Sequence, residues 1–293
     1  MQTLHRRRSE RVCAERPSDE QRLLLRKLSY AWTRHGDSYD SEMKRIVDRL
    51  CEITKETYSA GATRYRAVRG EKPRRDDTAM LDELIRMARS RQRRGKLVNR
   101  DGMVSVLDVG AAYGRDLLYL NSQEGVRAVG VDNVPQFINT LHDLEKDGKL
   151  PLGSCYKADM RDLRMFENNS FDVVRHNATL LHLPVLPNGI GADQAVAEAF
   201  RVLKPNGVLF VSVKEGRGLR YTDTGEGLGP RLFQYHNTIT LRRLLRRNGF
   251  RVLKTRVEYR QGPTEPFRIL VLFAEKPGQS IERRTPVTYE KAA

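Results

Sequence analysis

Short apolar segments alternate with helical patterns from Met103 onward, and this alternation restricts the fold more than any other feature of the sequence. Segments rich in Val and Leu at 103–109, 126–132, 171–177, 208–214, 251–259 and 267–275 are expected to be β-strands. Helical patterns occupy 115–123, 135–146, 192–203 and 238–248. Strands that are apolar along their whole length and separated by helices are typical of a mostly parallel sheet covered on both faces. The chain is therefore predicted to have an α/β fold.

The last two predicted strands are joined by residues 261–264, a Gln-Gly-Pro-Thr segment. This segment is too short for a helical crossover, which parallel neighbours would require. We therefore expect the last strand to be antiparallel. The following residues, 278–293, are polar and are expected to form a flexible tail.

The N-terminal third has a different character. Residues 19–94 show helical patterns, with Met43, Ile46, Val47, Leu50 and Cys51 recurring on one helical face. The chain has 53 Lys and Arg against 37 Asp and Glu, and the first hundred residues hold 26 of the basic and 15 of the acidic ones. Residues 1–100 are accordingly predicted to be a basic helical region that covers a ligand pocket, and 101–277 to be the α/β domain.

Composition excludes several classes of protein. The cysteines, Cys13, Cys51 and Cys155, form no CxxC or CxH pair, so neither a disulfide framework nor a metal site is expected. The longest apolar run, 269–274, is far too short to span a bilayer. We expect a cytoplasmic protein with no membrane partner, and the sequence gives no indication of its oligomeric state.

The end of the first predicted strand carries the first candidate ligand site. Gly110 and Gly114 let the backbone turn sharply and approach a ligand, and the helix that follows offers N–H groups to an anion. A dinucleotide site would have the pattern GxGxxG, but Ala112 and Arg115 occupy its second and third glycine positions. Asp132, at the end of the second strand, is placed to accept hydrogen bonds from a ribose diol. These residues indicate an adenosine ligand without a pyrophosphate.

The segment from Asp108 to Asp132 resembles the class I S-adenosylmethionine-dependent methyltransferases. Downstream, 158–160 (Ala-Asp-Met) is similar to the adenine-binding segment of that family, and 171–178 is similar to its fourth strand. Residues 200–207 resemble its "RVLKPGG" turn, with Asn206 in place of a glycine. The resemblance covers about 103–275, and four motifs in register make it specific.

The resemblance implies a Rossmann-like class I methyltransferase sheet, mostly parallel with an antiparallel last strand, preceded by an N-terminal helical region. It also implies S-adenosylmethionine as the cofactor. The cofactor-binding residues that it implies are Asp108, Gly110, Ala112, Gly114, Asp132, Asp159, Met160, Asn177 and Tyr65.

Two further segments resemble one bacterial branch of the family that acts mainly on small molecules. Residues 178–184 together with 213–216 are the first. The second is 58–65, which is similar to a "YD..A..Y" segment whose aromatic residues close over the cofactor, although Ser59 replaces the Asp. Tyr58 and Tyr65 also lie on one helical face, where core packing is the alternative interpretation.

The function predicted is transfer of a methyl group to an O or N nucleophile of a small molecule, a biosynthetic intermediate. His182 follows the fourth strand and is the candidate general base, because a neutral imidazole accepts a proton near pH 7. Simple packing is the alternative role for this residue, and His176 and His236 are weaker candidates. Residues 215–230 contain five glycines and are expected to be a mobile loop at the acceptor pocket.

Two alternatives stay open. Residues 86–100 hold seven basic residues and no acidic one, and would contact phosphates in an RNA or DNA methyltransferase. A solvated helix face explains the same charges. The second alternative is a non-catalytic scaffold that keeps the fold.

Beyond 215–230, Phe233 and Tyr235 are candidate residues for the wall of the acceptor pocket.

Overall fold

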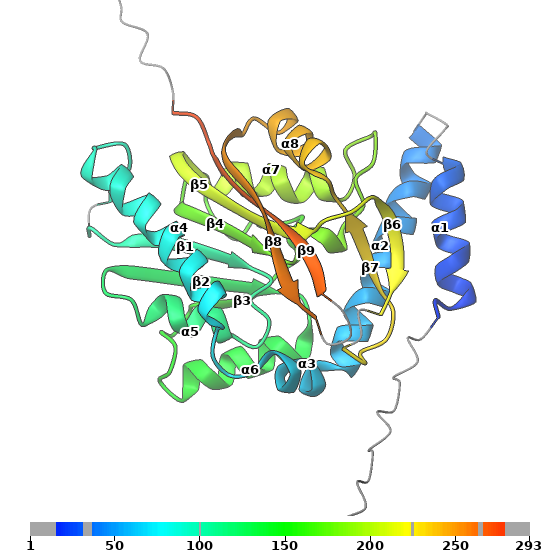
Figure 1. The fold of residues 1–293 in the computed structure, drawn as a ribbon, viewed down its shortest axis with the longest axis horizontal. Coiled ribbons are helices and arrows are strands. Elements are labelled where there is room, and N and C mark those ends of the chain that lie inside the picture. Colours follow the sequence, from blue (N-terminus) through cyan, green and yellow to red (C-terminus); the bar gives the residue numbers. More distant parts are fainter. Residues whose placement is uncertain (1–15, 32–36, 100, 224–225, 263–265, 279–293) are drawn as a thin grey trace, which may run out of the picture.

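The computed structural model describes residues 16–31, 37–99, 101–223, 226–262 and 266–278 (Figure 1). Its helices are α1 (Asp19–Ala31), α2 (Asp37–Ala60), α3 (Ala62–Arg69), α4 (Arg75–Arg93), α5 (Arg115–Asn121), α6 (Pro135–Lys146), α7 (Ala192–Val202) and α8 (Thr238–Arg247), with a 3₁₀ turn η1 (Leu180–His182). Its strands are β1 (Val104–Val109), β2 (Val126–Asp132), β3 (Cys155–Lys157), β4 (Phe171–Asn177), β5 (Leu203–Lys214), β6 (Gly218–Thr222), β7 (Arg231–Tyr235), β8 (Arg251–Gln261) and β9 (Pro266–Glu275). The predicted tail and Cys13 lie outside the described residues, except for residue 278.

Seven strands form one sheet in the order β3-β2-β1-β4-β5-β9-β8. Strands β1 to β5 pair in parallel, whereas β9 is antiparallel to both of its neighbours. The mostly parallel sheet with an antiparallel last strand is thus confirmed. Helices α4, α5 and α6 pack in the core of one face, and α7, α8 and η1 in that of the other.

Both faces of the sheet are covered because the strands are apolar on both sides. In β1, Val104 and Val106 are buried against α4 and α5, while Leu107 and Val109 are buried in the opposite core. This alternation explains why the strands read as continuous apolar runs rather than as an alternating pattern.

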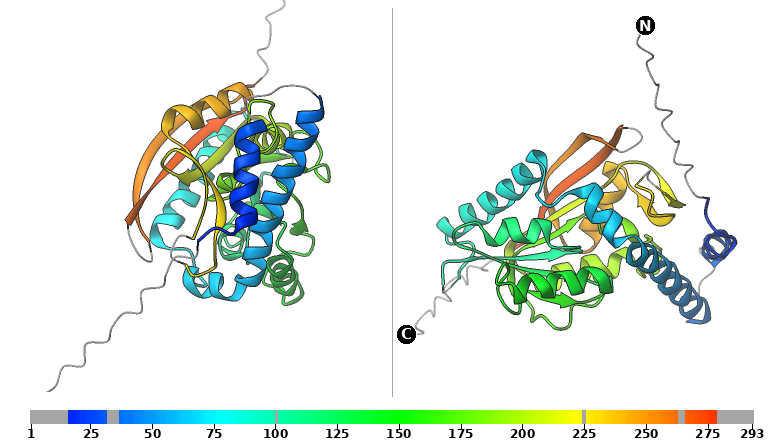
Figure 2. Two further views of the ribbon diagram at one scale, coloured as in Figure 1. Left: turned by 90° about the vertical axis from the view of Figure 1, so that its right-hand side faces the viewer. Right: turned by 90° about the horizontal axis from the view of Figure 1, so that it is seen from below.

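The N-terminal helices divide into two groups. Helices α1 and α2 lie side by side at one end of the molecule (Figure 2), and their apolar faces share a core with Tyr221 of β6 and Leu232 of β7. Helix α4 instead buries Leu81, Leu84 and Ala88 against the sheet. The predicted region 1–100 therefore includes a helix that is part of the sheet's cover.

Part of the predicted mobile loop at 215–230 is a regular strand, so that prediction was wrong. Strand β6 pairs antiparallel with β7, from Gly218 opposite Tyr235 to Thr222 opposite Arg231. The glycine-rich composition concealed the strand, whose stability comes from the distant core formed with α1 and α2. The sequence also gave no signal for β3, because three residues are too short for a recognisable period.

Candidate functional site

Two adjoining cavities lie at the carboxyl ends of the parallel strands, where ligands bind in open α/β sheets. The first has a volume of about 100 Å³ and the second of about 470 Å³. Residues that line both are Tyr58, Tyr65, Gly110, Ala112, Asn177, Ala178 and His182. The cavities are therefore neighbours that meet at these shared side chains.

The loop after β1 forms the boundary between the cavities. Gly110 has a φ of +78°, and a Cβ atom built on it would lie 2.0 Å from Cγ2 of Thr179. The Gly110 and Ala111 amides both donate to the carbonyl of Val131, at 2.8 and 3.0 Å, which ties the loop to the end of β2. Ala112 also has a positive φ, of 50°. Only glycine satisfies both the conformation and the space at position 110.

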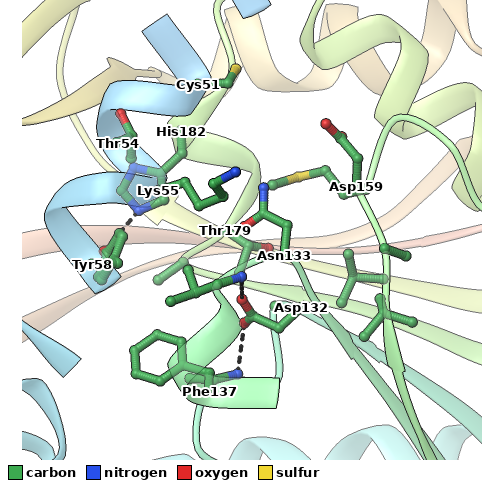
Figure 3. Close-up of a pocket in the computed structure, with 18 of the residues that line it drawn as sticks. Cys51, Thr54, Lys55, Tyr58, Asp132, Asn133, Phe137, Asp159, Thr179 and His182 are labelled. Atoms are coloured by element: carbon green, nitrogen blue, oxygen red, sulfur yellow. Dashed lines mark hydrogen bonds between the residues drawn. The ribbon is translucent and has the colours of Figure 1, made fainter. Parts of the chain in front are cut away.

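Asp132 is held with its carboxylate in the first cavity (Figure 3). Oδ2 accepts a hydrogen bond from the Ala112 amide and Oδ1 accepts one from the Val134 amide, both at 2.9 Å. Burial raises the pKa of this carboxyl to about 6, against the opposing effect of those backbone hydrogen bonds. The Asn133 amide also acts on this carboxylate, and because two carboxylate oxygens have about four acceptor positions, one remains for a further donor such as a hydroxyl of a diol.

The segment after β3 forms the opposite wall of the first cavity. Ala158, Asp159 and Met160 all line it. The Asp159 carboxylate accepts hydrogen bonds from Arg161, whose Nη1 also donates to Asp48 of α2 at 2.7 Å. This ion-pair chain links the wall to α2.

Aromatic side chains from the N-terminal helices complete the first cavity. The rings of Tyr58 and Tyr65 meet edge to face, with centroids 5.5 Å apart. Both also contact Phe137 of α6, and Tyr65 contacts Tyr113. The two tyrosines thus pack on one another and line the cavities at the same time, so the two interpretations of this segment are compatible.

His182 lines both cavities and has both ring nitrogens engaged. Figure 3 shows its ring beside Tyr58. Nδ1 is 2.7 Å from the carbonyl oxygen of Leu232, which can only accept, so Nδ1 carries the proton. Nε2 then accepts from the Tyr58 hydroxyl at 2.9 Å. Burial lowers the pKa of His182 to about 3, so the imidazole is neutral at pH 7. The lone pair of Nε2 is directed at the Tyr58 hydroxyl.

Two predicted cofactor residues do not line the first cavity. Asp108 faces the second cavity, where its Oδ1 accepts from Arg175 at 2.7 Å, and Arg175 also donates to Asp116. Gly114, at a φ of +88°, gives space to Leu141 of α6, since a Cβ atom would come within 2.7 Å of Cδ2 of that leucine. Asp108 and Gly114 therefore contribute to the conformation of the loop after β1 from outside the first cavity. The other predicted residues, Gly110, Ala112, Asp132, Asp159, Met160, Asn177 and Tyr65, line the first cavity.

The second cavity is lined by several residues to which the sequence assigned no role. Arg231 is fully buried and donates to Glu226, which also accepts from Arg69 of α3. Lys214, at the end of β5, lies beside Phe233. The position of Lys214 at the carboxyl end of a predicted strand was the signal that could have found it, because side chains at that edge of the sheet face the ligand.

Of the remaining candidate residues, only Phe233 lines one of the two cavities. His176 and His236 are buried, and neither they nor Tyr235 line either cavity. Phe233 does line the second cavity, as predicted. Within the described ranges, no group of three His, Cys, Asp or Glu side chains is arranged to hold a metal ion. Nor does any helix in those ranges have the length and apolar character needed to cross a bilayer.

Comparison with known families and relatives agrees with this geometry. The fold agrees with the resemblance of the motifs to the class I S-adenosylmethionine-dependent methyltransferases. Residues 107–211 match the family described as "Methyltransferase domain". A protein of Haemophilus influenzae described as uncharacterized is 32% identical over 136 residues, which are 43% of this chain and 52% of that protein. The matched segment is thus about half the length of that relative.

Solved structures share the fold at low sequence identity. An S-adenosylmethionine-dependent methyltransferase from Methanosarcina mazei has a TM-score of 0.51 and 21% identity, covering 61% of this chain and 94% of that one. The [4+2]-cyclase SpnF has a TM-score of 0.55 and 19% identity, covering 78% and 97%. Phosphoethanolamine N-methyltransferase 2 from Haemonchus contortus, in complex with S-adenosylmethionine, has a TM-score of 0.53 and 14% identity, covering 75% and 57%.

The residues of the first cavity fit S-adenosylmethionine, the cofactor of this class. A carboxylate with an unused acceptor position stands at Asp132 for a ribose diol. Met160 and Phe137 provide apolar surface for a purine ring. Gly110 lines both cavities and has no side chain, so a ligand can approach its backbone closely. Each requirement of an adenosine with a flexible tail is therefore met by a residue of this chain.

Proposed function

We propose that the protein transfers a methyl group from S-adenosylmethionine to an O or N nucleophile of a small molecule, a biosynthetic intermediate. The observation that carries this proposal is the arrangement of the two cavities. Asp132 and the Gly110 loop provide a site for the cofactor in the first, and a larger cavity of about 470 Å³ begins at the same shared residues. A cavity of this size is typical of small-molecule sites.

S-adenosylmethionine, when bound, supplies an electrophilic methyl carbon on a sulfonium. The protein must hold the nucleophile in line with that carbon and exclude water, and orientation of this kind contributes about 7–11 kcal/mol to rate enhancement. Tyr58 and Tyr65 cover the shared boundary and limit the access of water. Asn177 is oriented there because its Oδ1 accepts from the Ser212 hydroxyl at 2.6 Å.

His182 is proposed as the group that assists loss of the proton from the nucleophile. The route runs through Tyr58, whose hydroxyl proton can pass to Nε2 of His182 while the hydroxyl oxygen takes the proton of the acceptor. The hydrogen bond from Nδ1 to the Leu232 carbonyl fixes the tautomer that this route requires. With a pKa of about 3, His182 holds that proton only transiently at neutral pH.

A nucleic-acid acceptor is less well supported by the basic stretch at 86–100. Arg91 is paired with Glu275 at 2.9 Å, and Arg89 donates to the backbone carbonyl of Glu124. The apolar side of the same helix is buried on the sheet. Part of the basic stretch therefore serves the packing of α4.

The test is transfer of a radiolabelled methyl group from S-adenosylmethionine to fractions of a cell lysate separated into small molecules, RNA and protein. We expect label in the small-molecule fraction, and we expect Asp132→Ala to abolish it. Asp143→Asn, an exposed carboxylate on α6, is the matched control and keeps full activity. Label confined to RNA or protein would contradict the proposal. So would calorimetry showing no binding of S-adenosylmethionine, which is the result expected of a non-catalytic scaffold.

A further inference from the structure

Lys214 holds a distinctive place in the second cavity. It is the last residue of β5, pairs with Ile269 of β9, and lines the second cavity but not the first. Its Nζ lies 4.8 Å from the centroid of the Phe233 ring and 4.9 Å from that of Phe267. The ammonium is therefore directed between two aromatic rings at the edge of the sheet where ligands bind.

The buried and partly buried arginines of the same cavity already have carboxylate partners. Arg69 and Arg231 bond to Glu226, Arg175 to Asp108 and Asp116, Arg115 to Asp116 and Asp77, and Arg260 to Asp76 and Glu258. The Lys214 ammonium, in contrast, makes neither a hydrogen bond nor an ion pair with any described residue. Aromatic rings attract a cation but accept no strong hydrogen bond, so its three N–H donors are available to a ligand.

The cation is only partly compensated electrostatically. Burial lowers the pKa of Lys214 to about 8, and the charged groups acting on it are Glu226, Arg231, Arg69 and Asp223. Glu226 is shared with two arginines, which limits its effect on the lysine. A ligand oxyanion at this position would make a charge-assisted hydrogen bond in a partly desolvated setting, where such bonds are strongest.

Lys214 is also separated from the cofactor loop. The sheet order β1-β4-β5 places it two strands away from Gly110, which is about 10 Å at the usual strand spacing. The Phe233 ring, Leu181 and Val213 line the same cavity and give it an apolar wall. These surroundings suit a ligand with an apolar body and one anionic group.

We infer that the acceptor carries an oxyanion, a carboxylate or a phosphate, on an apolar body, and that Lys214 binds this group and thereby selects the acceptor. This inference rests on the proposed function, because it assigns the second cavity to the acceptor. Lys214 is a binding and specificity residue in this assignment, with no part in proton transfer.

The experiment uses benzoate, phenyl phosphate and the neutral benzamide as probes. Each is titrated calorimetrically into the full chain saturated with S-adenosylhomocysteine. We expect one of the anions to bind about tenfold or more tightly than benzamide, since a hydrogen bond to a charged group contributes about 1.5–3 kcal/mol. The stronger of the two anions identifies the oxyanion. Anion affinity no better than that of benzamide would overturn the inference.

Two variants separate the charge from the shape of the side chain. Lys214→Met should weaken the preferred anion about tenfold and leave benzamide unchanged, whereas Lys214→Arg should retain most of the affinity. Thermal melting of both variants checks that each is folded. Equal anion affinity in the folded Met variant and in the wild type would refute the role of Lys214.

The affinity for S-adenosylhomocysteine distinguishes the two proposals. If the wild type does not bind it, the proposed function fails. If it binds, and Lys214→Met weakens it by the same factor as the anion, then Lys214 holds the cofactor's own carboxylate and the inference about the acceptor is wrong. Unchanged affinity for S-adenosylhomocysteine beside weakened anion binding supports the inference.

Discussion

The two cavities differ in how the chain builds them. The first is formed largely by segments that directly follow β1, β2, β3 and β4, with backbone amides holding Asp132. The second collects charged side chains from α3, α4, β4, β5, β7 and the end of β8. The first is therefore a local product of the sheet topology, whereas the second depends on residues far apart in the sequence. Because a site formed at strand ends follows from the fold, proteins that share the fold can share it. A site formed by side chains from distant segments can differ from one protein to the next.

The largest expected effect comes from breaking the buried ion-pair cluster of Arg175, Asp108 and Asp116, which lines the second cavity. Arg175→Met leaves Asp108 and Asp116 buried without their common partner, and loss of one member of a buried pair costs about 3–5 kcal/mol. Chemical denaturation should show a loss of that size in the free energy of unfolding. Arg164→Met, which removes an exposed pair with Asp162, is the control and should leave stability unchanged. A loss below about 1 kcal/mol for Arg175→Met would show that the ion pairs of Arg175 with Asp108 and Asp116 do not stabilise the fold.

The next effect should be confined to the first cavity. Gly110→Ala forces a Cβ atom onto Thr179 at a positive φ, and we expect the affinity for S-adenosylmethionine to fall about 100-fold, or roughly 3 kcal/mol. Gly148→Ala is the matched control, because Gly148 has a φ of +70° with nothing within 4 Å of the added Cβ. It carries the backbone strain without the collision. Calorimetry showing equal affinity in the two variants would remove Gly110 from the site.

A pH titration should produce a smaller effect on the same cavity. Asp132 has a pKa of about 6 and must be ionised to accept hydrogen bonds from a diol. The affinity for S-adenosylmethionine should therefore be highest above pH 7 and should decrease as the pH falls through 6. The expected loss between pH 7.5 and pH 5 is about tenfold. His176, His182 and His236 do not account for it, because burial lowers their pKa values to about 4, 3 and 4. The Asp132→Asn variant should bind weakly and lack this pH dependence, and a retained dependence would assign it elsewhere.

The smallest effect should come from the boundary between the cavities. Tyr58→Phe keeps the ring but removes the hydroxyl from His182, at a cost of about 1 kcal/mol and hence about fivefold in kcat. Tyr119→Phe removes a hydroxyl that bonds to Asp82 outside both cavities and should leave kcat unchanged. Steady-state rates with a saturating acceptor provide the measurement. An unchanged kcat for Tyr58→Phe would exclude the proton route through this hydroxyl.

The same contrast explains how much the sequence could predict. The strands at 126–132 and 171–177 were placed at their observed ends, because both are bounded by turn residues and are rich in Val and other apolar residues. Asp132 was identified because its role follows from its position at a strand end. These features depend on the local chain and on a sheet topology with few alternatives.

The features that were missed depend on distant partners. Arg175 interrupts an apolar strand, but the residues that compensate its charge lie 67 and 59 positions earlier in the chain. The β6–β7 pair is stabilised by α1 and α2, nearly two hundred residues away. Glycines in that region suggested a loop because propensity is a local quantity that tertiary packing overrides. A buried Arg in an apolar strand is nevertheless a usable signal that carboxylates lie nearby.

Tyr58, Tyr65 and His182 have surfaces in both cavities, and this has a thermodynamic consequence. A ligand that orders these side chains in one cavity lowers the entropic cost of binding in the other. Linkage then requires the factor by which the cofactor tightens the acceptor to equal the factor by which the acceptor tightens the cofactor. Under the proposed function, any change that the cofactor makes to acceptor affinity through this wall is matched by an equal change that the acceptor makes to cofactor affinity.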